Sequence, residues 1–412
     1  MSIDQLKPPK NKFDYWIFIL SLLLLSLVFI LNGCIGSLTG PSGPGRRGDT
    51  WTVMIYLNGD NDLESQAIAD INSMEMVGST DKVKIVVQYD SLSGPAARYL
   101  IQKDNNLSEI TSPVLQQLGE VNMGNWSTLV DFVRYCANKY PAEKYALILW
   151  NHGSGFKGKN ISFDQTSFND SISIPELGLA LQEAKLALGR PINFLGMDAC
   201  LMAMVEVAYE IRDTARILVS SQESVPGEGW DYTTLLGNLT VNPAMDEIQL
   251  ARITADSYVQ QFPSQNITIS VTDLSQMNEL VAGIGQLSRA ILSDTRTSPF
   301  IYMDTGDSSQ YFSDYDFIDL GDLASLLTNN NRILSPEVKT AALTISNLLP
   351  QVVLYNRTNG SEVGRSHGLS IYFPYDPYNP KYELLAFTRE ASWNQVIQKI
   401  NAWRKFQRNP KN

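Results

Sequence analysis

The chain contains a series of short apolar runs that are bounded by turn residues and separated by segments with helical periodicity. The two clearest runs, residues 145–150 and 192–197, are apolar at nearly every position and end in polar corners that carry His152 and Cys200. Such runs are typical of strands in a parallel sheet, where helices cover both faces. The pattern therefore predicts an α/β fold with a mostly parallel central sheet flanked by helices.

Similar patterns predict the remaining elements. Further strands are expected at residues 51–57, 83–89, 97–102, 216–221, 267–272, 351–355 and 368–373. Apolar residues at spacings of three and four predict a helix that ends near residue 77 and helices at residues 126–138, 175–188 and 201–211. From residue 244 onward helical patterns dominate, and this part either extends the sheet or forms a subdomain.

The N-terminus has the features of an export signal. Three lysines precede an apolar run at residues 16–31, and a small residue, Gly33, stands before Cys34. A charged start, a short apolar core and a small residue before the break are typical of a signal peptide. The end of this segment resembles a prokaryotic lipoprotein signal, in which Cys34 is lipidated. The alternative is an uncleaved signal anchor, because the run is only slightly shorter than the roughly 20 residues of a spanning helix.

Both interpretations place the rest of the chain on the extracytoplasmic face of a prokaryotic membrane, held by a lipid or by the signal anchor. The predicted organisation is an export signal or anchor at residues 1–34, a flexible tether rich in glycine, serine and proline at 35–48, a core at 49–240, and a mainly helical C-terminal extension or subdomain at 241–412.

Composition excludes several classes of function. The net charge of −11 argues against a nucleic-acid partner, which requires a basic face. The chain has only three cysteines and two histidines, too few for a disulfide framework or a zinc cluster, and no metal site is expected. His152 and Cys200 therefore have few competitors for the role of a reactive pair.

The two polar corners have the chemistry of a thiol nucleophile and its base. A thiol attacks a carbonyl as the thiolate, so it needs a nearby base and often a helix N-terminus. Cys200 directly precedes the predicted helix at residues 201–211, and His152 is expected at the same edge of the sheet. The backbone amides of Gly153 and Cys200 are candidates for an oxyanion hole. The alternative is a purely structural cysteine.

The other cysteine and histidine that follow the tether have simpler interpretations. Cys136 lies in the apolar stripe of the predicted helix at residues 126–138 and is expected to be a small buried hydrophobe. His367 stands before a later predicted strand and is expected to be structural.

Several motifs together resemble a known family. His152 precedes Cys200 by 48 residues, close to the spacing of about 50 found in caspases. An apolar run followed by Asn-His-Gly, and another followed by Asp-Ala-Cys, resemble the clostripain family of cysteine peptidases in the caspase-like group. The likeness covers roughly residues 50–400 and includes Met54-Ile-Tyr-Leu-Asn58, Pro226-Gly-Glu-Gly-Trp230, Asp319-Leu-Gly-Asp322 and Gly368-Leu-Ser-Ile-Tyr-Phe-Pro374.

The resemblance implies a caspase-like sandwich, with its catalytic core at residues 49–240, and an endopeptidase that cleaves after arginine or lysine. Cys200 matches the nucleophile and His152 the general base. Asp198 matches an acidic group of the pocket for the basic side chain, and its alternative role is a cap on the following helix. Glu223, in the glycine-rich loop after residue 221, is the preferred second acidic group; Glu228 and Asp231 are further candidates.

The resemblance also bears on cofactors. Members of the family often depend on calcium, yet no twelve-residue calcium loop is present in this sequence. The acidic run Asp314, Asp316, Asp319 and Asp322 is interpreted as a solvated face and helix cap. We therefore expect that no cofactor is required; calcium is the alternative that stays open, without a clear motif to support it.

The last expectation concerns the polar segment between His152 and residue 175. Lys157 and Lys159 lie in it, and related enzymes are commonly processed between the histidine and cysteine motifs. Self-cleavage after Lys157 or Lys159 is therefore expected, the alternative being a simple solvated connector. The expected partners are peptides or proteins with basic residues and the membrane that holds the N-terminus. A caspase-like surface binding or scaffold protein without catalysis is the alternative function.

Overall fold

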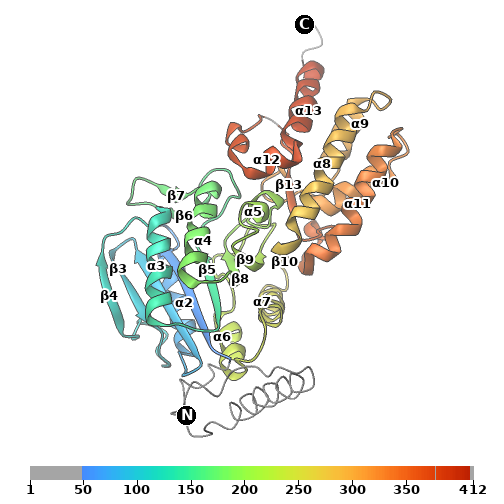
Figure 1. Ribbon diagram of the computed structural model, residues 1–412. Coiled ribbons are helices and arrows are strands. Elements are labelled where there is room, and N and C mark those ends of the chain that lie inside the picture. The colour runs from blue at the N-terminus through green and yellow to red at the C-terminus, as the bar shows by residue number, and fades with distance from the viewer. Residues whose placement is uncertain (1–48, 376, 409–412) are drawn as a thin grey trace, which may run out of the picture. The chain divides into compact units, whose positions relative to one another are not determined.

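The computed structural model describes residues 49–375 and 377–408, and its centre is one large sheet (Figure 1). Within the described residues the sheet has nine strands, in the order β12-β10-β9-β8-β5-β1-β2-β3-β4. Their bounds are β1 (Trp51–Gly59), β2 (Val83–Ser91), β3 (Gly94–Leu100), β4 (Val114–Gly119), β5 (Lys144–Trp150), β8 (Ile192–Asp198), β9 (Ala215–Ser220), β10 (Ile267–Asp273) and β12 (Val353–Asn359). The five central strands, from β9 to β2, are parallel, and the two at either edge pair antiparallel.

The central strands are buried on both faces, as their apolar runs predict. In β1, Val53, Ile55 and Leu57 belong to one apolar core, whereas Met54 and Tyr56 belong to the other. Because successive side chains of a strand point to opposite faces, each central strand supplies both cores. The parallel pairing of β5 with β8 brings the carboxyl ends of these two strands to the same edge of the sheet.

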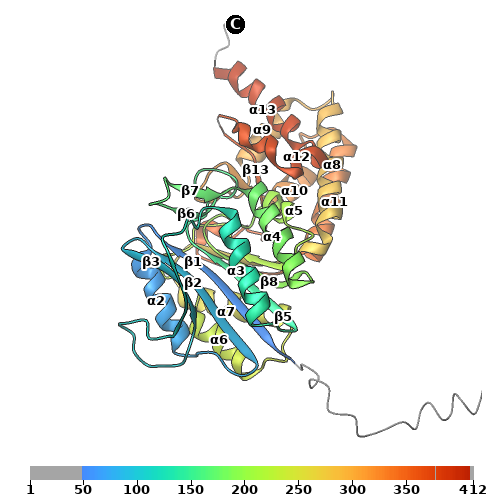
Figure 2. The ribbon, with the colours of Figure 1, turned by 60° about the vertical axis from the view of Figure 1, so that its left-hand side comes forward.

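Helices cover both faces of the sheet (Figures 1 and 2). One face carries α3 (Trp126–Lys139), α4 (Ile174–Leu188) and α5 (Val205–Glu210), and the other carries α2 (Glu64–Glu75), α6 (Tyr232–Val241) and α7 (Glu247–Gln261). The bounds of α4 follow from its sequence: Ser173 and Glu176 form a capping box, Pro175 lies in the first turn, and Gly189 ends the helix in the left-handed conformation. The predicted α/β fold is confirmed.

The part of the chain after β10 is mainly helical, as predicted. Its elements are the short 3-10 helices Leu274–Gln276, Ser361–Val363 and Pro380–Leu384, the helices α8 (Met277–Ser293), α9 (Pro299–Asp307), α10 (Leu320–Asn329), α11 (Pro336–Val352), α12 (Ala386–Ala391) and α13 (Trp393–Arg408), and a two-stranded sheet of β11 (Phe317–Asp319) and β13 (Ser370–Tyr372). This part also extends the main sheet through β10 and β12, and Gly48–Asn412 form one compact unit. A domain division at residue 240 stays a prediction.

The polar segment between the histidine and cysteine motifs differs from its expected form. It contains a two-stranded hairpin of β6 (Ile161–Asp164) and β7 (Asp170–Ile172) rather than a simple solvated connector. Ile161, Phe163 and Ile172 are buried against the core, which gives this short polar sequence an apolar anchor. Its strands are too short and irregular to show a period in the sequence.

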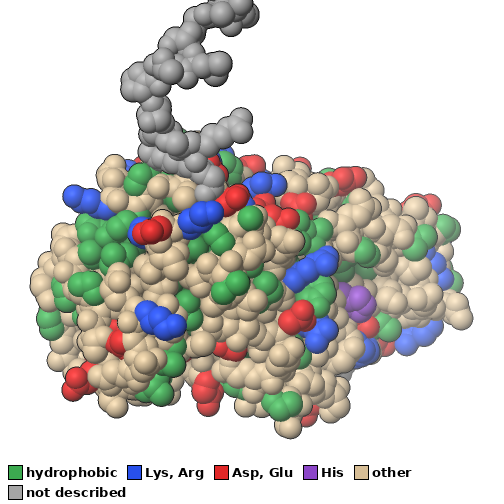
Figure 3. Space-filling view, turned by 90° about the horizontal axis from the view of Figure 1, so that it is seen from below, with side chains coloured by type: hydrophobic (Ala, Val, Ile, Leu, Met, Phe, Trp, Pro, Cys, Tyr) green, Lys and Arg blue, Asp and Glu red, His purple; other side chains and the backbone are tan. Residues whose placement is uncertain are grey.

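The surface and the N-terminus complete the description. On the face shown in Figure 3, acidic and basic side chains are interspersed among uncharged groups. Among the described residues, no helix has both the length and the hydropathy needed to cross a membrane. The predicted signal or anchor at 1–34, the lipidation site Cys34 and the tether at 35–48 lie outside the described residues.

Candidate active site

His152 and Cys200 lie at the same edge of the sheet, at equivalent positions after adjacent strands. Trp150, the last residue of β5, is paired with Asp198, the last residue of β8. His152 and Cys200 each follow two residues later, so the register brings them together. Both line one cavity of about 200 Å³. The juxtaposition expected from the apolar runs is present in the structure.

The backbone between the two residues is tightly packed at Gly153. A Cβ atom at Gly153 would lie 2.4 Å from the carbonyl oxygen and 3.1 Å from the amide nitrogen of Cys200. Only glycine fits here, because these contacts are far shorter than a side chain tolerates. The peptide groups of Gly153 and Cys200 are therefore neighbours, as an oxyanion hole made of their two amides requires.

His152 is held by an acidic residue that the sequence analysis missed. Its Nε2 atom is 2.9 Å from Oδ1 of Asp62, and its ring packs edge-on against Phe163. The hydrogen bond to His152 lowers the pKa of the Asp62 carboxyl, and burial opposes this effect. Asp62 lies in the turn after β1, at the same edge of the sheet, which is the one signal that the sequence offered for it.

Cys200 is covered by the glycine-rich loop. The Val225 amide donates a hydrogen bond to Sγ of Cys200 at 3.2 Å. Burial raises the pKa of the Cys200 thiol, and the hydrogen bonds of Val225 and Ser224 offset this in part. The structure thus pairs His152 with Asp62 and Cys200 with Val225.

The expected helix dipole at Cys200 is absent from the structure. Leu201 adopts a left-handed φ of 63°, and α5 begins only at Val205. The prediction of a helix that starts directly after Cys200 was wrong, because the apolar residues 201–204 form a buried turn that looks helical in sequence. The thiol therefore depends on its base and on nearby amides for activation.

Asp198 lines the same cavity as the thiol. Its side chain is 4% exposed; Oδ2 accepts hydrogen bonds from the Trp230 amide and the Tyr232 hydroxyl, both at 3.0 Å. Oδ1 is buried without a partner among the described residues. Burial raises the pKa of Asp198 to about 7, and the Trp230 amide and Tyr232 hydroxyl oppose this shift. Asp198 is not a helix cap, since α5 is preceded by Met204.

The glycine-rich loop is fitted closely to Asp198. Gly229 has a φ of 58°, and a Cβ atom there would lie 2.7 Å from Oδ2 of Asp198. A second buried carboxylate, Asp70, accepts a hydrogen bond of 2.7 Å from the indole of Trp150. Burial, and then the charge of Asp198, raise the pKa of Asp70 well above its usual value. Sequence reasoning missed Asp70, which lies in the middle of α2.

Glu223 does not face this cavity. Its carboxylate accepts hydrogen bonds from the amides of Ser224 and Ser313, and it lines a separate cavity with Gln310 and Arg365. Its backbone carbonyl accepts a hydrogen bond from the Leu201 amide. Glu223 and Asp198 therefore line different cavities. A role of Glu223 in substrate binding stays a prediction without support from its position.

Glu228 and Asp231, the other two acidic residues of the loop that were considered for substrate binding, also lie outside the cavity of His152 and Cys200. Asp231 caps α6 by accepting a hydrogen bond from the Thr234 amide. Glu228 is exposed and lines a shallow cavity beside Asp70. Neither lines the cavity of His152 and Cys200.

The two lysines proposed as self-cleavage sites have contrasting environments. The Lys157 ammonium lies 2.8 Å from Asp314 and 2.7 Å from Asp316, and it is largely shielded from solvent. Lys159 is exposed, and its ammonium lies 4.0 Å from the centre of the Phe163 ring. Lys159 is therefore the more accessible of the two.

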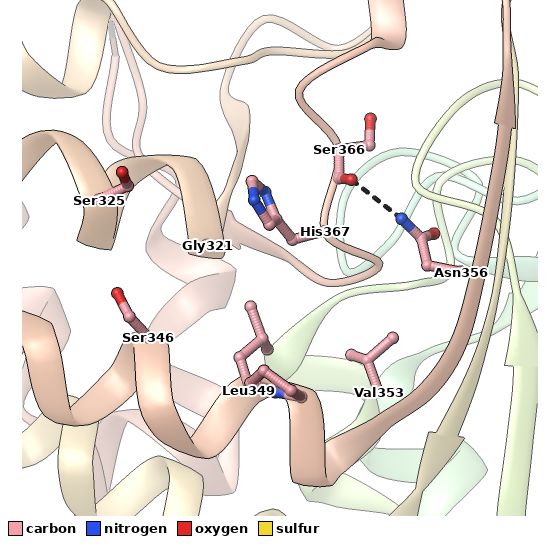
Figure 4. A pocket seen from close by; sticks show the side chains of 9 residues that line it. Gly321, Ser325, Ser346, Leu349, Val353, Asn356, Ser366 and His367 are labelled. Carbon is pink, nitrogen blue, oxygen red and sulfur yellow. Dashed lines mark hydrogen bonds between the residues drawn. The ribbon is translucent and has the colours of Figure 1, made fainter.

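The remaining histidine and cysteine lie elsewhere. Cys136 is fully buried within α3, as predicted. His367 lies at a cavity of about 430 Å³ formed with α10 and α11, where Asn356 donates a hydrogen bond to the Ser366 carbonyl (Figure 4). Nδ1 of His367 is 2.8 Å from Asp319, and this hydrogen bond raises the histidine pKa.

The acidic run from Asp314 to Asp322 was weighed above in connection with calcium. Its carboxylates form ion pairs or hydrogen bonds within the protein. Asp314 and Asp316 bind Lys157, and Asp322 binds Arg365. Asp319 caps α10 through the Asp322 amide. The helix-cap interpretation is therefore right for Asp319. The interpretation as a solvated face was wrong for Asp319 and Asp322, which are 0% and 7% exposed because they pair within the fold.

Comparison with known proteins places this geometry in a family. The model of the clostripain family matches residues 55–403 of the chain. Clostripain of Hathewaya histolytica is 23% identical over 419 aligned residues, which cover 84% of this chain and 79% of that protein.

Solved structures share the fold. A secreted C11 cysteine protease from Bacteroides thetaiotaomicron, in complex with an irreversible peptide inhibitor, matches with a TM-score of 0.65 at 21% identity and covers 84% of this chain and 99% of that one. An inactive zymogen C11 protease from Parabacteroides distasonis matches with a TM-score of 0.63 at 21% identity, over 84% and 98% of the two chains.

These matches confirm the caspase-like α/β fold, and the family uses thiol chemistry that requires no cofactor. The family model covers most of the sequence, from β1 to α13. The chain therefore belongs to the clostripain family and is a cysteine peptidase.

Proposed function

We propose that this peptidase is held on the extracytoplasmic face of a membrane and cleaves peptides after arginine or lysine with Cys200 as nucleophile and His152 as base. The observation that carries the proposal is one cavity that contains the thiol, the imidazole and the buried carboxylate of Asp198. A buried carboxylate in the same cavity as the nucleophile is suited to a cationic side chain next to the scissile bond.

The chemistry follows from the contacts of the two reactive residues. Asp62 engages Nε2 of His152, so Nδ1 is the ring nitrogen left to act as base. Nδ1 takes the thiol proton, and the thiolate attacks the substrate carbonyl carbon. The negative charge on the oxygen is stabilised by the amides of Gly153 and Cys200, and Nδ1–H then protonates the leaving amine. Water hydrolyses the resulting thioester and regenerates the thiol.

Specificity for basic residues rests on Asp198. Its Oδ1 atom is buried and has no hydrogen-bond partner among the residues that the structure describes, which is unfavourable until a donor occupies the cavity. A guanidinium or ammonium group supplies that donor and stabilises the ionised carboxylate. Arginine is favoured over lysine because its planar group can donate two hydrogen bonds to one carboxylate.

The proposed location rests on the N-terminal sequence. The apolar run at residues 16–31 and the Gly33-Cys34 pair are typical of an exported lipoprotein or a signal anchor. The similar protease from Bacteroides thetaiotaomicron is described as secreted, which agrees with an extracytoplasmic enzyme. Metabolic labelling with a fatty acid, compared between the wild type and Cys34→Ser, distinguishes lipidation from an uncleaved anchor.

A library of fluorogenic peptides varied at the residue before the scissile bond tests the function. The wild type is expected to cleave after arginine and lysine, and Cys200→Ala to cleave nothing. A correctly folded wild type without activity on any member of the library would instead support the silent binding protein.

A further inference from the structure

A short loop of the mainly helical C-terminal part, residues 311–316, lies beside the active site. The Ser313 hydroxyl is 2.6 Å from the hydroxyl of Ser224, which itself hydrogen-bonds to the Cys200 thiol. The Ser313 amide donates hydrogen bonds to the two carboxylate oxygens of Glu223, at 3.2 and 3.1 Å. Because an extended chain spans about 3.3–3.6 Å per residue, a substrate residue a few positions from the scissile bond can reach this loop.

The loop presents two aromatic side chains to solvent. Tyr311 and Tyr315, here called the tyrosine pair, are 51% and 69% exposed, and their ring centres are 4.9 Å apart. Phe312 and Phe317, in contrast, are buried and anchor the loop in the core. A β-bridge between Tyr311 and Ile318 closes the loop. The tyrosine pair is thus held in place before a ligand binds, which lowers the entropic cost of binding.

The tyrosine pair lines two cavities, of about 460 and 570 Å³. The larger one is acidic, since the side chains of Glu223 and Glu362 also line it. Within the described residues, neither glutamate forms an ion pair with a lysine, arginine or histidine. Arg365 lines the same cavity, but its guanidinium pairs with Asp322 at 2.8 Å. The cavity therefore combines aromatic rings with carboxylates that have no cationic partner in this part of the chain.

Neighbouring aromatic rings already bind basic side chains of the protein itself. The Arg404 guanidinium lies 4.7 Å from the centre of the Tyr375 ring, and the Lys157 ammonium lies 5.2 Å from that of Phe317. A cation within about 6 Å of an aromatic ring centre is attracted to the face of the ring. The exposed tyrosine pair and the two glutamates offer the same chemistry to a basic side chain from outside.

We propose that the larger cavity and the tyrosine pair bind a second basic side chain of the substrate, several residues from the scissile bond. The aliphatic stem of this arginine or lysine lies on the ring faces, and its charged group pairs with Glu362. The position is separate from the cavity of Asp198. The preferred substrate is then an extended polypeptide with two separated basic residues. This inference rests on the proposed function, because it takes cleavage after a basic residue as given.

Long internally quenched peptides with one arginine before the scissile bond test the inference. A second arginine is placed in turn at each other position on either side, and the peptide bond after it is N-methylated to prevent cleavage there. Each peptide is compared with a counterpart that carries neutral citrulline at the second position. At one position, or at two adjacent ones, arginine should lower KM about five- to tenfold relative to citrulline and leave kcat unchanged, because the contact stabilises substrate and transition state equally.

Two variants assign this effect to the proposed site. Tyr315→Ala removes one ring face, and Glu362→Gln removes the charge. Each should abolish most of the advantage of the second arginine, while kcat/KM for a short peptide with a single arginine stays unchanged. The matched control is Glu183→Gln, which changes a surface glutamate of α4 that pairs with Arg134 and should keep the full advantage. If Tyr315→Ala fails to fold, Glu362→Gln decides alone.

Three results would overturn the inference. The first is a wild type for which a second arginine is no better than citrulline at any position. The second is an undiminished advantage in both variants. The third is an equal gain from norleucine, which would show an apolar contact rather than a site for a cation. The short peptide tests the proposed function separately, so cleavage after its arginine without any effect of a second arginine refutes this inference alone.

Discussion

Replacing Asp198 by asparagine should remove the preference for basic substrates while leaving the fold intact. The asparagine side-chain oxygen can still accept the hydrogen bond of the Trp230 amide, so the fit of the glycine-rich loop is kept. What is lost is the charge in the cavity of the thiol. Breaking a buried, hydrogen-bonded charge pair costs about 3 kcal/mol, which corresponds to a decrease of roughly 150-fold in kcat/KM for an arginine substrate.

The assay compares two peptides that differ in one group, with arginine or its neutral isostere citrulline before the scissile bond. In the wild type the arginine peptide should be cleaved much faster, and in Asp198→Asn the two rates should become similar. This cycle separates the charge interaction from any general damage, which would lower both rates together. An equal loss for both peptides, or a retained arginine preference, would refute the role of Asp198.

The pH dependence provides a second test of the same carboxylate. Burial raises the pKa of Asp198 to about 7 in the empty cavity, and only the ionised form attracts a cationic side chain. The ratio of kcat/KM for the arginine peptide to that for the citrulline peptide should therefore fall as the pH decreases below about 7. Titration of the thiol and imidazole affects both peptides and cancels in the ratio. The measurement covers about pH 5 to 8, on both sides of the Asp198 pKa. If the ratio of the two kcat/KM values does not change over this range, Asp198 is not the group that selects the basic side chain.

Three further predictions concern the reactive pair and its surroundings. Cys200→Ala and His152→Ala should each abolish activity to a similar degree, because the two act as a unit; full retention in either would remove it from the mechanism. Asp62→Asn should reduce kcat/KM only about fivefold, since an exposed ion pair contributes about 1 kcal/mol or less, and unchanged kinetics would show that Asp62 does not orient the base. Self-cleavage, followed by mass spectrometry, should occur after Lys159 and be blocked by Lys159→Gln but not by Lys157→Gln, because Lys157 is held by two aspartates; equal cleavage in Cys200→Ala would show that another protease is responsible.

The position of the reactive residues at one edge of the sheet could be predicted, because it depends on apolar runs that are local in the sequence. The apolar runs of β5 and β8 indicated central parallel strands, and parallel strands bring their carboxyl ends to one edge. From this alone His152 and Cys200 were expected together, and the family resemblance added Asp198. The structure places all three at one cavity. Gly153 was selected for its lack of a side chain, and its contact with the Cys200 backbone shows why.

Features that depend on loop paths could not be predicted in the same way. Glu223 lies nearest to the end of β9 in sequence, but hydrogen bonds to the Ser313 amide, 90 residues away, turn its carboxylate from the cavity. The helix after Cys200 begins late because Leu201 adopts a left-handed conformation, which apolar periodicity does not reveal.

Labelling of the nucleophile tests the central claim most directly. The full-length chain is incubated with a peptidyl chloromethyl ketone that carries arginine next to the reactive group, and the modified residue is located by peptide mass spectrometry. We predict one adduct, on Cys200, which is lost in His152→Ala and is far slower when aspartate replaces arginine in the reagent. The buried thiol of Cys136 serves as the internal control and should stay unmodified. No adduct on Cys200, or labelling that is equally fast with the aspartate reagent, would contradict a Cys200–His152 peptidase that selects basic residues.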